Sequence, residues 1–194
     1  MEHKAYILRT CNADMSSRNG FVWPREGWAE APDWKPTAEC GHGLHGALWG
    51  EGDGSLLDWS DGAVWIVAGI DEWIGLGGKV KFPRAEVVFA GNRDEAIACI
   101  KARGAEGATI GDTATAGDYG TATAGYRGTA SAGYRGTATA GNEGTLCMSF
   151  WDGKRRRIIV AHVGEDGVKP NTAYRVCDGK IVPADTKPSA EVAQ

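Results

Sequence analysis

Residues 113–144 read TATAGDYG, TATAGYRG, TASAGYRG and TATAGNEG, four octapeptides that follow one another without an insertion. Each octapeptide joins an alternating Thr/Ala segment, with Ser131 replacing one threonine, to a Gly-x-x-Gly segment. Alternation places the hydroxyl residues on one face of a short strand and the alanines on the other. The glycines supply backbone freedom at both ends of a tight turn, where positive φ is expected. The repeat therefore predicts a stack of short strands joined by turns.

Eight residues are too few to close a coil around a core, so we expect two octapeptides to form one 16-residue coil. In such a stack residue i lies over residue i+16, at the usual strand separation of about 4.8 Å. Thr121 then lies over Thr137, and Arg127 lies over Glu143 in an ion pair between coils. A core of alanines buries little apolar area, so the stack needs folded segments at both ends.

Two segments of the tract, GYRGTASAG (residues 125–133) and GYRGTATAG (residues 133–141), resemble the AGYGSTxTAG repeats of bacterial ice-nucleation proteins. The resemblance implies 16-residue β-solenoid coils with outward Thr-x-Thr pairs. These pairs would be Thr113 and Thr115, Thr121 and Thr123, Thr129 and Ser131, and Thr137 and Thr139. The ice-nucleation proteins stack dozens of coils, whereas two rungs per face make a small surface. Ice binding is therefore a minor alternative.

Charge and composition limit the classes of partner. The chain of 194 residues has a net charge of −4 and an isoelectric point near 5.6. A nucleic-acid-binding surface needs a basic stripe, and the one dense basic run, residues 154–157, leads directly into apolar residues. Nucleic acid is therefore not the predicted partner.

The cysteines and the apolar segments indicate the compartment. Five cysteines (Cys11, Cys40, Cys99, Cys147 and Cys177) form no CxxC pair, and an odd, widely spaced set does not fit a disulfide framework. The first residues contain no apolar signal segment, and no apolar run is long enough to span a membrane. We expect a reduced, cytoplasmic protein without a membrane span.

Residues 1–103 predict a small, tryptophan-rich α+β domain. Strands are expected at residues 4–10, 44–49, 63–69, 79–82 and 85–89. A capping-box pattern at Asn92 opens a helix over residues 93–103, which we expect to cover the open end of the first coil. Seven of the eight tryptophans fall in this segment, either as core residues in a domain with long loops or as plates for a sugar or a heterocycle.

The CGHGLHG segment contains the residues with the most evident chemistry. Cys40, His42 and His45 could together bind zinc, with Cys11 or an acidic residue as fourth ligand, although no second ligand cluster occurs at a recognisable spacing. His42 or His45 could also serve as a general base in an enzyme or a small-ligand (nucleotide or sugar) site. The alternating glycines equally fit a tight loop entering a strand. No nucleophile or cofactor motif accompanies the segment, and no cofactor is predicted.

The remaining segments complete the predicted organisation: a solenoid over residues 104–146, a hairpin cap over residues 147–184 and a disordered tail over residues 185–194. Hairpin strands are expected at residues 146–151 and 156–163, and at residues 173–177 and 180–183. The overall fold class is α+β with a short β-solenoid. The flanking segments resemble uncharacterised phage and prophage proteins, which implies a role in phage–host conflict.

The sequence favours a binding protein over an enzyme. Tyrosine and arginine side chains commonly anchor interfaces, and the repeat presents both in its turns beside a threonine array. The candidate binding residues are Tyr119, Tyr126, Arg127, Tyr134, Arg135, Thr121, Thr123, Thr137 and Thr139. The expected partner is a second copy of the chain, in a homo-oligomer, or a host protein. The resemblance to phage proteins implies a phage-encoded inhibitor of host defence.

Overall fold

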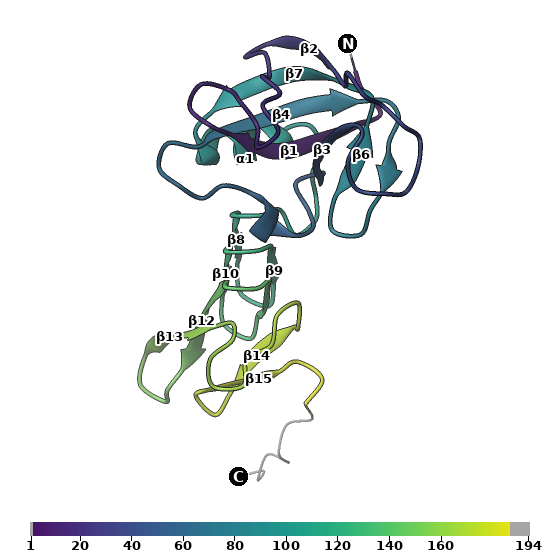
Figure 1. Ribbon diagram of the computed structural model, residues 1–194. Helices are drawn as coiled ribbons and strands as arrows, with labels where there is room; N and C mark the ends of the chain where they lie inside the picture. Colours follow the sequence, from purple (N-terminus) through teal and green to yellow (C-terminus); the bar gives the residue numbers. More distant parts are fainter. Residues whose placement is uncertain (1, 187–194) are drawn as a thin grey trace. The chain divides into compact units, whose positions relative to one another are not determined.

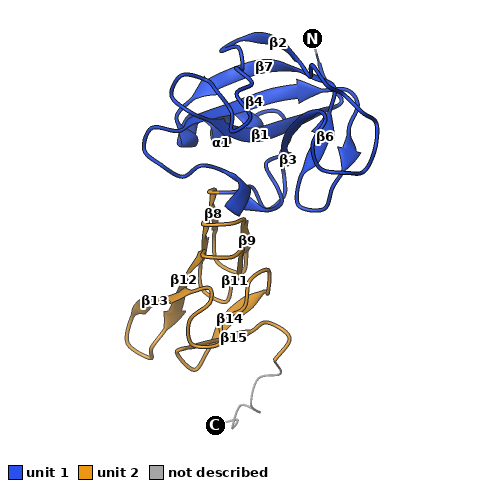
Figure 2. Cartoon of the chain, viewed as in Figure 1, with its two compact units in different colours: residues 1–110 blue, residues 111–194 orange. Residues whose placement is uncertain are grey.

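The computed structural model describes residues 2–186 of the chain. These residues fold into two compact units, one ending at Ile110 and one beginning at Gly111, coloured separately in Figure 2. The boundary falls just before the first octapeptide. The disordered tail predicted at residues 185–194 lies outside the described residues, except for its first two positions.

The first unit is built on one antiparallel sheet of seven strands (Figure 1). The strands are β1 (Ala5–Cys11), β2 (Gly27–Glu30), β3 (Leu44–Leu48), β4 (Val64–Ile70), β5 (Ile74–Gly75), β6 (Val80–Phe82) and β7 (Arg84–Gly91). They lie in the order β2-β7-β4-β1-β3-β6-β5. Each predicted strand of this unit is confirmed, with end points shifted by up to two residues. The short strands β2 and β5 lie in segments that the sequence suggested to be loops.

Apolar side chains cover both faces of this sheet. Ile7, Ile66 and Phe82 join one buried cluster, together with Trp23 from the loop after β1. Residues that alternate with them along the strands point to the opposite face. There the helix α1 (Arg93–Lys101) packs against β1, β4 and β7. The sheet therefore lies between α1 and a loop-covered core.

The helix begins after Asn92, as its sequence predicts, and its apolar residues form the buried side. The side chain of Asn92 accepts a hydrogen bond from the backbone N–H of Glu95 at 2.9 Å, which satisfies one of the free donors of the first turn. Ala96, Ile97 and Ile100 form its buried side. The expectation that the helix also covers the first coil stays a prediction.

The second unit begins with the solenoid. Its four repeat strands are β8 (Thr113–Ala116), β9 (Thr121–Ala124), β10 (Thr129–Ala132) and β11 (Thr137–Ala140). β10 pairs in parallel with β8, so that Thr129 lies beside Thr113, and β11 pairs in parallel with β9, so that Thr137 lies beside Thr121. Both registers equal 16 residues, which confirms the 16-residue coil.

The interior of the solenoid consists of alanine methyl groups. The residues Ala122, Ala124, Ala130, Ala132, Ala138 and Ala140 are all buried, whereas the threonines of the same strands are exposed or half-buried. The predicted alanine-in, threonine-out alternation is therefore confirmed. Leu146 and Met148 continue the same buried row, so the core widens after the last repeat.

Two hairpins extend the sheets of the solenoid after its last repeat. β12 (Thr145–Trp151) pairs in parallel with β10 and antiparallel with β13 (Arg156–His162). β14 (Tyr174–Cys177) pairs antiparallel with both β11 and β15 (Lys180–Pro183). The sheet orders are β13-β12-β10-β8 and β15-β14-β11-β9. Both predicted hairpins are confirmed, and they close the alanine core with larger side chains.

The conformation predicted for the corner glycines is wrong. Positive φ falls instead on the residue before the second glycine of each turn, namely Tyr119, Arg127, Arg135 and Glu143, with φ between 53° and 60°. Several corner glycines are required by close stacking. A Cβ atom on Gly133 would lie 2.5 Å from the backbone nitrogen of Asp118 in the preceding coil. Glycine is needed there because backbone stacks directly on backbone.

The fold class α+β is also wrong. Among residues 2–186, strand accounts for 41% and helix for 6%, in three sheets with one α-helix. In the first hundred residues, only the segment after Asn92 has a sequence pattern that predicts a helix. The rest of the tryptophan-rich unit forms strands and loops, apart from a 3₁₀ turn at Gly54–Leu56. The protein is β-rich.

The stacking of glycine on backbone gives a direct test. Replacing Gly133 with alanine should destabilise the second unit by about 1–3 kcal/mol, because the methyl group overlaps Asp118. Gly117 holds the equivalent place one coil earlier, where no atom would lie within 4 Å of a Cβ. Gly117→Ala should therefore change the free energy of unfolding by no more than about 0.5 kcal/mol. Chemical denaturation followed by circular dichroism measures both, and equal effects would contradict the stacking.

Candidate functional site

The outward faces of the solenoid carry rows of hydroxyl side chains. Thr121 and Thr123 are exposed on β9, beside the half-buried Thr137 and Thr139 of β11. The other sheet presents Thr113, Thr115, Thr129, Ser131 and Thr145 on three adjacent strands. Strand spacing is about 4.8 Å, so each face is a small flat grid of two or three rungs. The structure thus brings together all four predicted binding threonines on one face.

The turns of the solenoid stack into two corners. We call residues 117–120 and 133–136 the first corner, and residues 125–128 and 141–144 the second corner. In each turn the N–H of the second glycine donates to the carbonyl of the first, at 3.0 to 3.1 Å. Positive φ at the third residue is typical of a type II turn, which usually places glycine or asparagine there. Here tyrosine, arginine and glutamate occupy this position, so large side chains project from both corners.

The second corner is held together by its own side chains. Nε of Arg127 donates to Glu143 at 2.8 Å, and the hydroxyl of Tyr126 donates to the other carboxylate oxygen at 2.6 Å. The hydrogen bond from Tyr126, followed by that from Arg127, lowers the pKa of Glu143 below its usual value. The predicted ion pair between coils is confirmed. Tyr126 and Arg127 therefore serve, at least in part, to join successive coils.

The first corner presents a more open aromatic surface. The side chain of Tyr119 is 69% exposed, and its ring meets that of Tyr134 edge-on at 6.2 Å. The guanidinium of Arg135 lies 5.3 Å from the centre of the Tyr134 ring. Two tyrosines and an arginine are thus gathered on one edge of the solenoid.

Asp118 anchors this corner to the hairpin that follows the repeats. Its carboxylate accepts the backbone N–H of Tyr134 at 2.9 Å and two hydrogen bonds from Arg156 of β13, at 2.7 and 3.1 Å. The pair with Arg156, followed by the bond from Tyr134, lowers the pKa of Asp118. The repeat register alone could not reveal this contact, because Arg156 lies outside the octapeptides.

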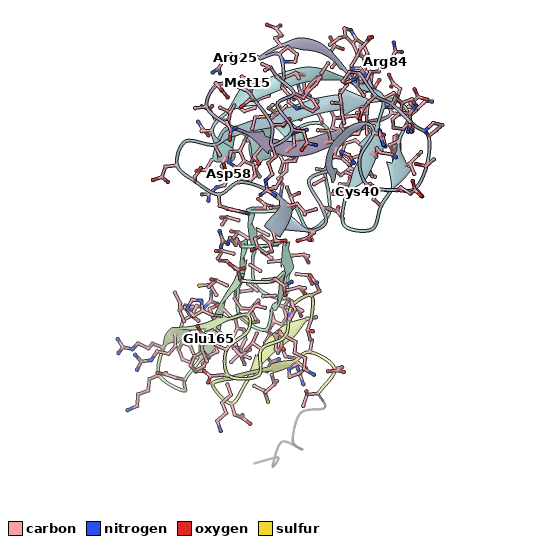
Figure 3. All side chains as sticks on the ribbon, in the orientation of Figure 1. Met15, Arg25, Cys40, Asp58, Arg84 and Glu165 are labelled. Atoms are coloured by element: carbon pink, nitrogen blue, oxygen red, sulfur yellow. The ribbon has the colours of Figure 1, made fainter. Side chains whose placement is uncertain are left out.

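Within the described residues, the Cys40, His42 and His45 side chains of the CGHGLHG segment do not share a partner. Cys40 is exposed beside β6 (Figure 3), and its sulfur accepts a hydrogen bond from Nζ of Lys79 at 3.2 Å. His42 lies 3.3 Å from the carboxylate of Asp33, whereas His45 lies on β3. Across residues 2–186 no three His, Cys, Asp or Glu side chains gather in a way that could hold a metal ion.

His45 is held in its neutral form. Burial, followed by the nearby cations Lys79, Arg9 and Lys81, lowers its pKa from 6.5 to about 4. Lys81 lies directly across the β3–β6 pair from His45. The side chain of His45 remains uncharged at neutral pH, and its Nε2 is buried without a hydrogen-bond partner among the described residues.

Two polar clusters of the first unit were not predicted. Lys81 is fully buried, with Nζ donating to the carbonyl of Glu39 at 2.8 Å, so it fixes the loop before the CGHGLHG segment. His3 is also buried, with one ring nitrogen 2.9 Å from Glu86 and the other 3.3 Å from Asp71. A lysine and a histidine in strand-like segments carry no local signal of burial, so only the sheet pairing reveals them.

The comparisons with known proteins divide along the chain. Residues 5–99, within the first unit, match the family described as Domain of unknown function (DUF7666). The description assigns no chemistry to this unit. No solved structure matches the chain.

Half of the chain is similar to ice nucleation proteins. It is 42% identical over 103 residues to the ice nucleation protein of Xanthomonas campestris pv. translucens, covering 51% of this chain and 7% of that protein. It is 41% identical over 100 residues to InaU of Pantoea ananas, covering 50% and 10%, and 42% identical over 110 residues to a protein of Pseudomonas syringae, covering 55% and 10%. The chain thus spans a tenth or less of these relatives' length. The resemblance found in the repeat is confirmed, and the protein is a β-rich repeat protein related to them.

None of the helices in the described part of the chain is both long and apolar enough to cross a membrane. The nine-residue α1 is the longest of them.

The depressed pKa of His45 predicts an acid-sensitive first unit. Between pH 6.5 and about 4 the unfolded chain binds a proton at this histidine that the folded chain does not, so stability falls as the pH drops through this window. His45→Gln should remove this part of the pH dependence. Thermal unfolding followed by tryptophan fluorescence reports mainly on this unit, because Trp151 alone lies outside it. An unchanged pH profile in the variant would contradict the assignment.

Proposed function

We propose that the chain is a non-enzymatic interaction protein whose β-solenoid presents a rigid surface to a protein partner. The observation that carries the proposal is the first corner, where the largely exposed Tyr119 lies against Tyr134 beside Arg135. Tyrosine and arginine supply much of the binding energy at protein interfaces, and exposed aromatic rings gain from being covered.

The solenoid suits this role because its geometry is fixed before binding. Each repeat strand pairs in register with its equivalent in the next coil, and the turns are hydrogen-bonded across coils as well. Because the backbone that carries these side chains is already ordered, it loses little conformational entropy when a partner binds. A rigid corner with two aromatic rings can thus bind without first ordering a loop.

The proposal also specifies the kind of partner and the cellular compartment. The partner is a second copy of the chain or a protein of a host cell, and the chain acts in the cytoplasm. The resemblance of the flanking segments to phage and prophage proteins supports an inhibitor of host defence. An alternative, a small ligand bound near the CGHGLHG loop, gains no support, because Cys40 contacts Lys79 whereas His42 contacts Asp33.

The corner proposal is tested with a triple variant, Tyr119→Ala, Tyr134→Ala and Arg135→Ala. It removes the three projecting side chains of the first corner and leaves the hydrogen bond from the backbone N–H of Tyr134 to Asp118. We expect capture of a protein partner from host lysate, measured by affinity purification and mass spectrometry, to fall at least about tenfold, equivalent to about 1.4 kcal/mol.

The matched control replaces the four outward threonines at positions 121, 123, 137 and 139 with valine, which keeps their β-branched shape. This variant should still capture the partner, since its corners are intact. A triple variant that binds as well as the unchanged chain, while folding normally, would rule out the first corner as the binding surface.

A second candidate function, contact with ice, is favoured by one observation. The relatives are named ice nucleation proteins, and this chain presents outward threonine pairs on adjacent strands. The grid has two or three rungs per face, about 10 Å across at the usual strand spacing. So small a face orders few water molecules compared with relatives of which the matched segment spans a tenth or less.

A freezing assay separates the two candidates. Droplets containing the chain should freeze at the same temperature as droplets with an equal mass of albumin, because the threonine grid is too small to template ice. Droplets that freeze at a clearly higher temperature would favour the ice-related function, provided that the four-valine variant loses the effect.

A further inference from the structure

β13 is an outermost strand whose outer edge pairs with no other strand between residues 2 and 186. Edge strands that must stay single are usually protected by proline, by lysine or by being short. β15, the edge of the opposite sheet, has these features: it spans four residues and contains Lys180 and Pro183. β13 spans seven residues, and its second half, Ile158 to His162, contains neither lysine nor proline. Arg156 and Arg157 charge its first half, so the second half is the unprotected part of this edge (Figure 1).

The backbone groups on this edge can be identified from one hydrogen bond. The N–H of Val163, just after the strand, donates to Gly144 at 2.9 Å and so points toward β12. Backbone groups alternate in direction along an antiparallel strand. Those of Ile158 and Val160 therefore point away from β12, toward the free edge.

The outward face beside this edge is apolar. Ile158 is 70% exposed, Val160 is 53% exposed, and Trp151 on the neighbouring β12 is 56% exposed. Ile158 lies opposite Ser149, and Trp151 lies opposite Arg156, so all three apolar side chains point to the same face. Large apolar side chains gathered at an open edge indicate a surface that another strand covers.

We propose that this strand is β13 of a second copy of the chain, paired antiparallel about a two-fold axis at Ile159. Ile158 of each copy then lies opposite Val160 of the other copy. The apolar side chains are in contact, and the free backbone groups of the two strands form hydrogen bonds. The proposal rests on the proposed function only in treating the second unit as an interaction module. It assigns pairing with a second copy to β13 and leaves the first corner for the host protein, so the two surfaces have different partners.

Charge favours a second copy over an unrelated strand. Lys154 and Arg155 precede β13, and Glu165 and Asp166 follow it in the next turn. None of these four side chains forms an ion pair within the described part of the chain. In an antiparallel pair centred on Ile159, the basic end of each strand lies beside the acidic end of its partner. The strand is thus complementary to itself.

The pairing would also enlarge the threonine face. A two-fold axis perpendicular to an antiparallel pair keeps the outward faces of both sheets on the same side. The four-stranded sheet of β13, β12, β10 and β8 would join its copy in one eight-stranded sheet, with the threonine rows of both copies on one side of it. Any partner of this face would meet twice the surface.

The first test removes the edge hydrogen bond. Sedimentation equilibrium of the full chain should give twice the monomer mass. Val160→Pro deletes an outward N–H without touching the pairing with β12, and it should give the monomer mass. Val160→Thr keeps the N–H and the strand preference, and it should remain a dimer. An unchanged chain that is monomeric, or a folded Val160→Pro variant that is dimeric, would overturn the proposal.

The second test uses the charges and holds even if the proline variant fails to fold. Variant one carries Lys154→Glu and Arg155→Glu, and variant two carries Glu165→Lys and Asp166→Lys. Each alone places like charges together and should be monomeric, whereas an equimolar mixture should form a heterodimer, seen by native mass spectrometry. The control, Arg25→Glu with Lys35→Glu in the first unit, makes the same charge change as variant one and should stay dimeric.

The outcomes are distinguishable from those of the corner test. A mixture that stays monomeric, or single variants that stay dimeric, would overturn the β13 pairing and leave the first corner untouched. The triple corner variant should keep the dimer mass, because Tyr119, Tyr134 and Arg135 lie outside β13.

Discussion

The close stacking of each coil on the next, residue i on residue i+16, is the constraint on which the second unit depends. Two backbones at strand separation leave no room for a side chain at several turn positions, which is why glycine recurs there. The same spacing brings Arg127 and Tyr126 to Glu143, and Asp118 to Tyr134. Once the register is set, the corners, the flat faces and the narrow interior all follow.

A narrow interior explains the rest of the unit. Alanine buries little apolar area, so stacked octapeptides alone gain too little to offset the entropy of ordering the chain. After the last repeat, Leu146, Met148 and Tyr174 enter the same buried row, and the hairpins cover them. This closure leaves β13 at the edge of its sheet with apolar side chains exposed. The narrow alanine interior is thus the reason both for the larger core after the repeats and for the free edge of β13.

The sequence predicted those features that repeat or alternate, and it missed those that depend on distant contacts. The period of the octapeptides predicted the coil, the buried alanines and the Arg127–Glu143 pair. It could not predict the pair between Asp118 and Arg156, nor the burial of Lys81 and His3, since their partners lie far along the chain. Glycine was assigned the positive φ that Tyr119 and Arg135 adopt, because turn statistics do not include the stacking of one coil on another. The class α+β is wrong although its one predicted helix is confirmed, because the rest of the tryptophan-rich segment forms strands and loops.

The stacking register is tested most directly by nuclear Overhauser effects between backbone protons of the repeat strands in solution. The account predicts strong cross-strand effects between Thr121 and Thr137 and between Ala122 and Ala138, which lie side by side on β9 and β11. Effects linking Thr121 to Thr129 as neighbours would indicate an eight-residue period. Either that pattern or an absence of cross-strand effects in this tract would contradict the 16-residue coil and every surface derived from it.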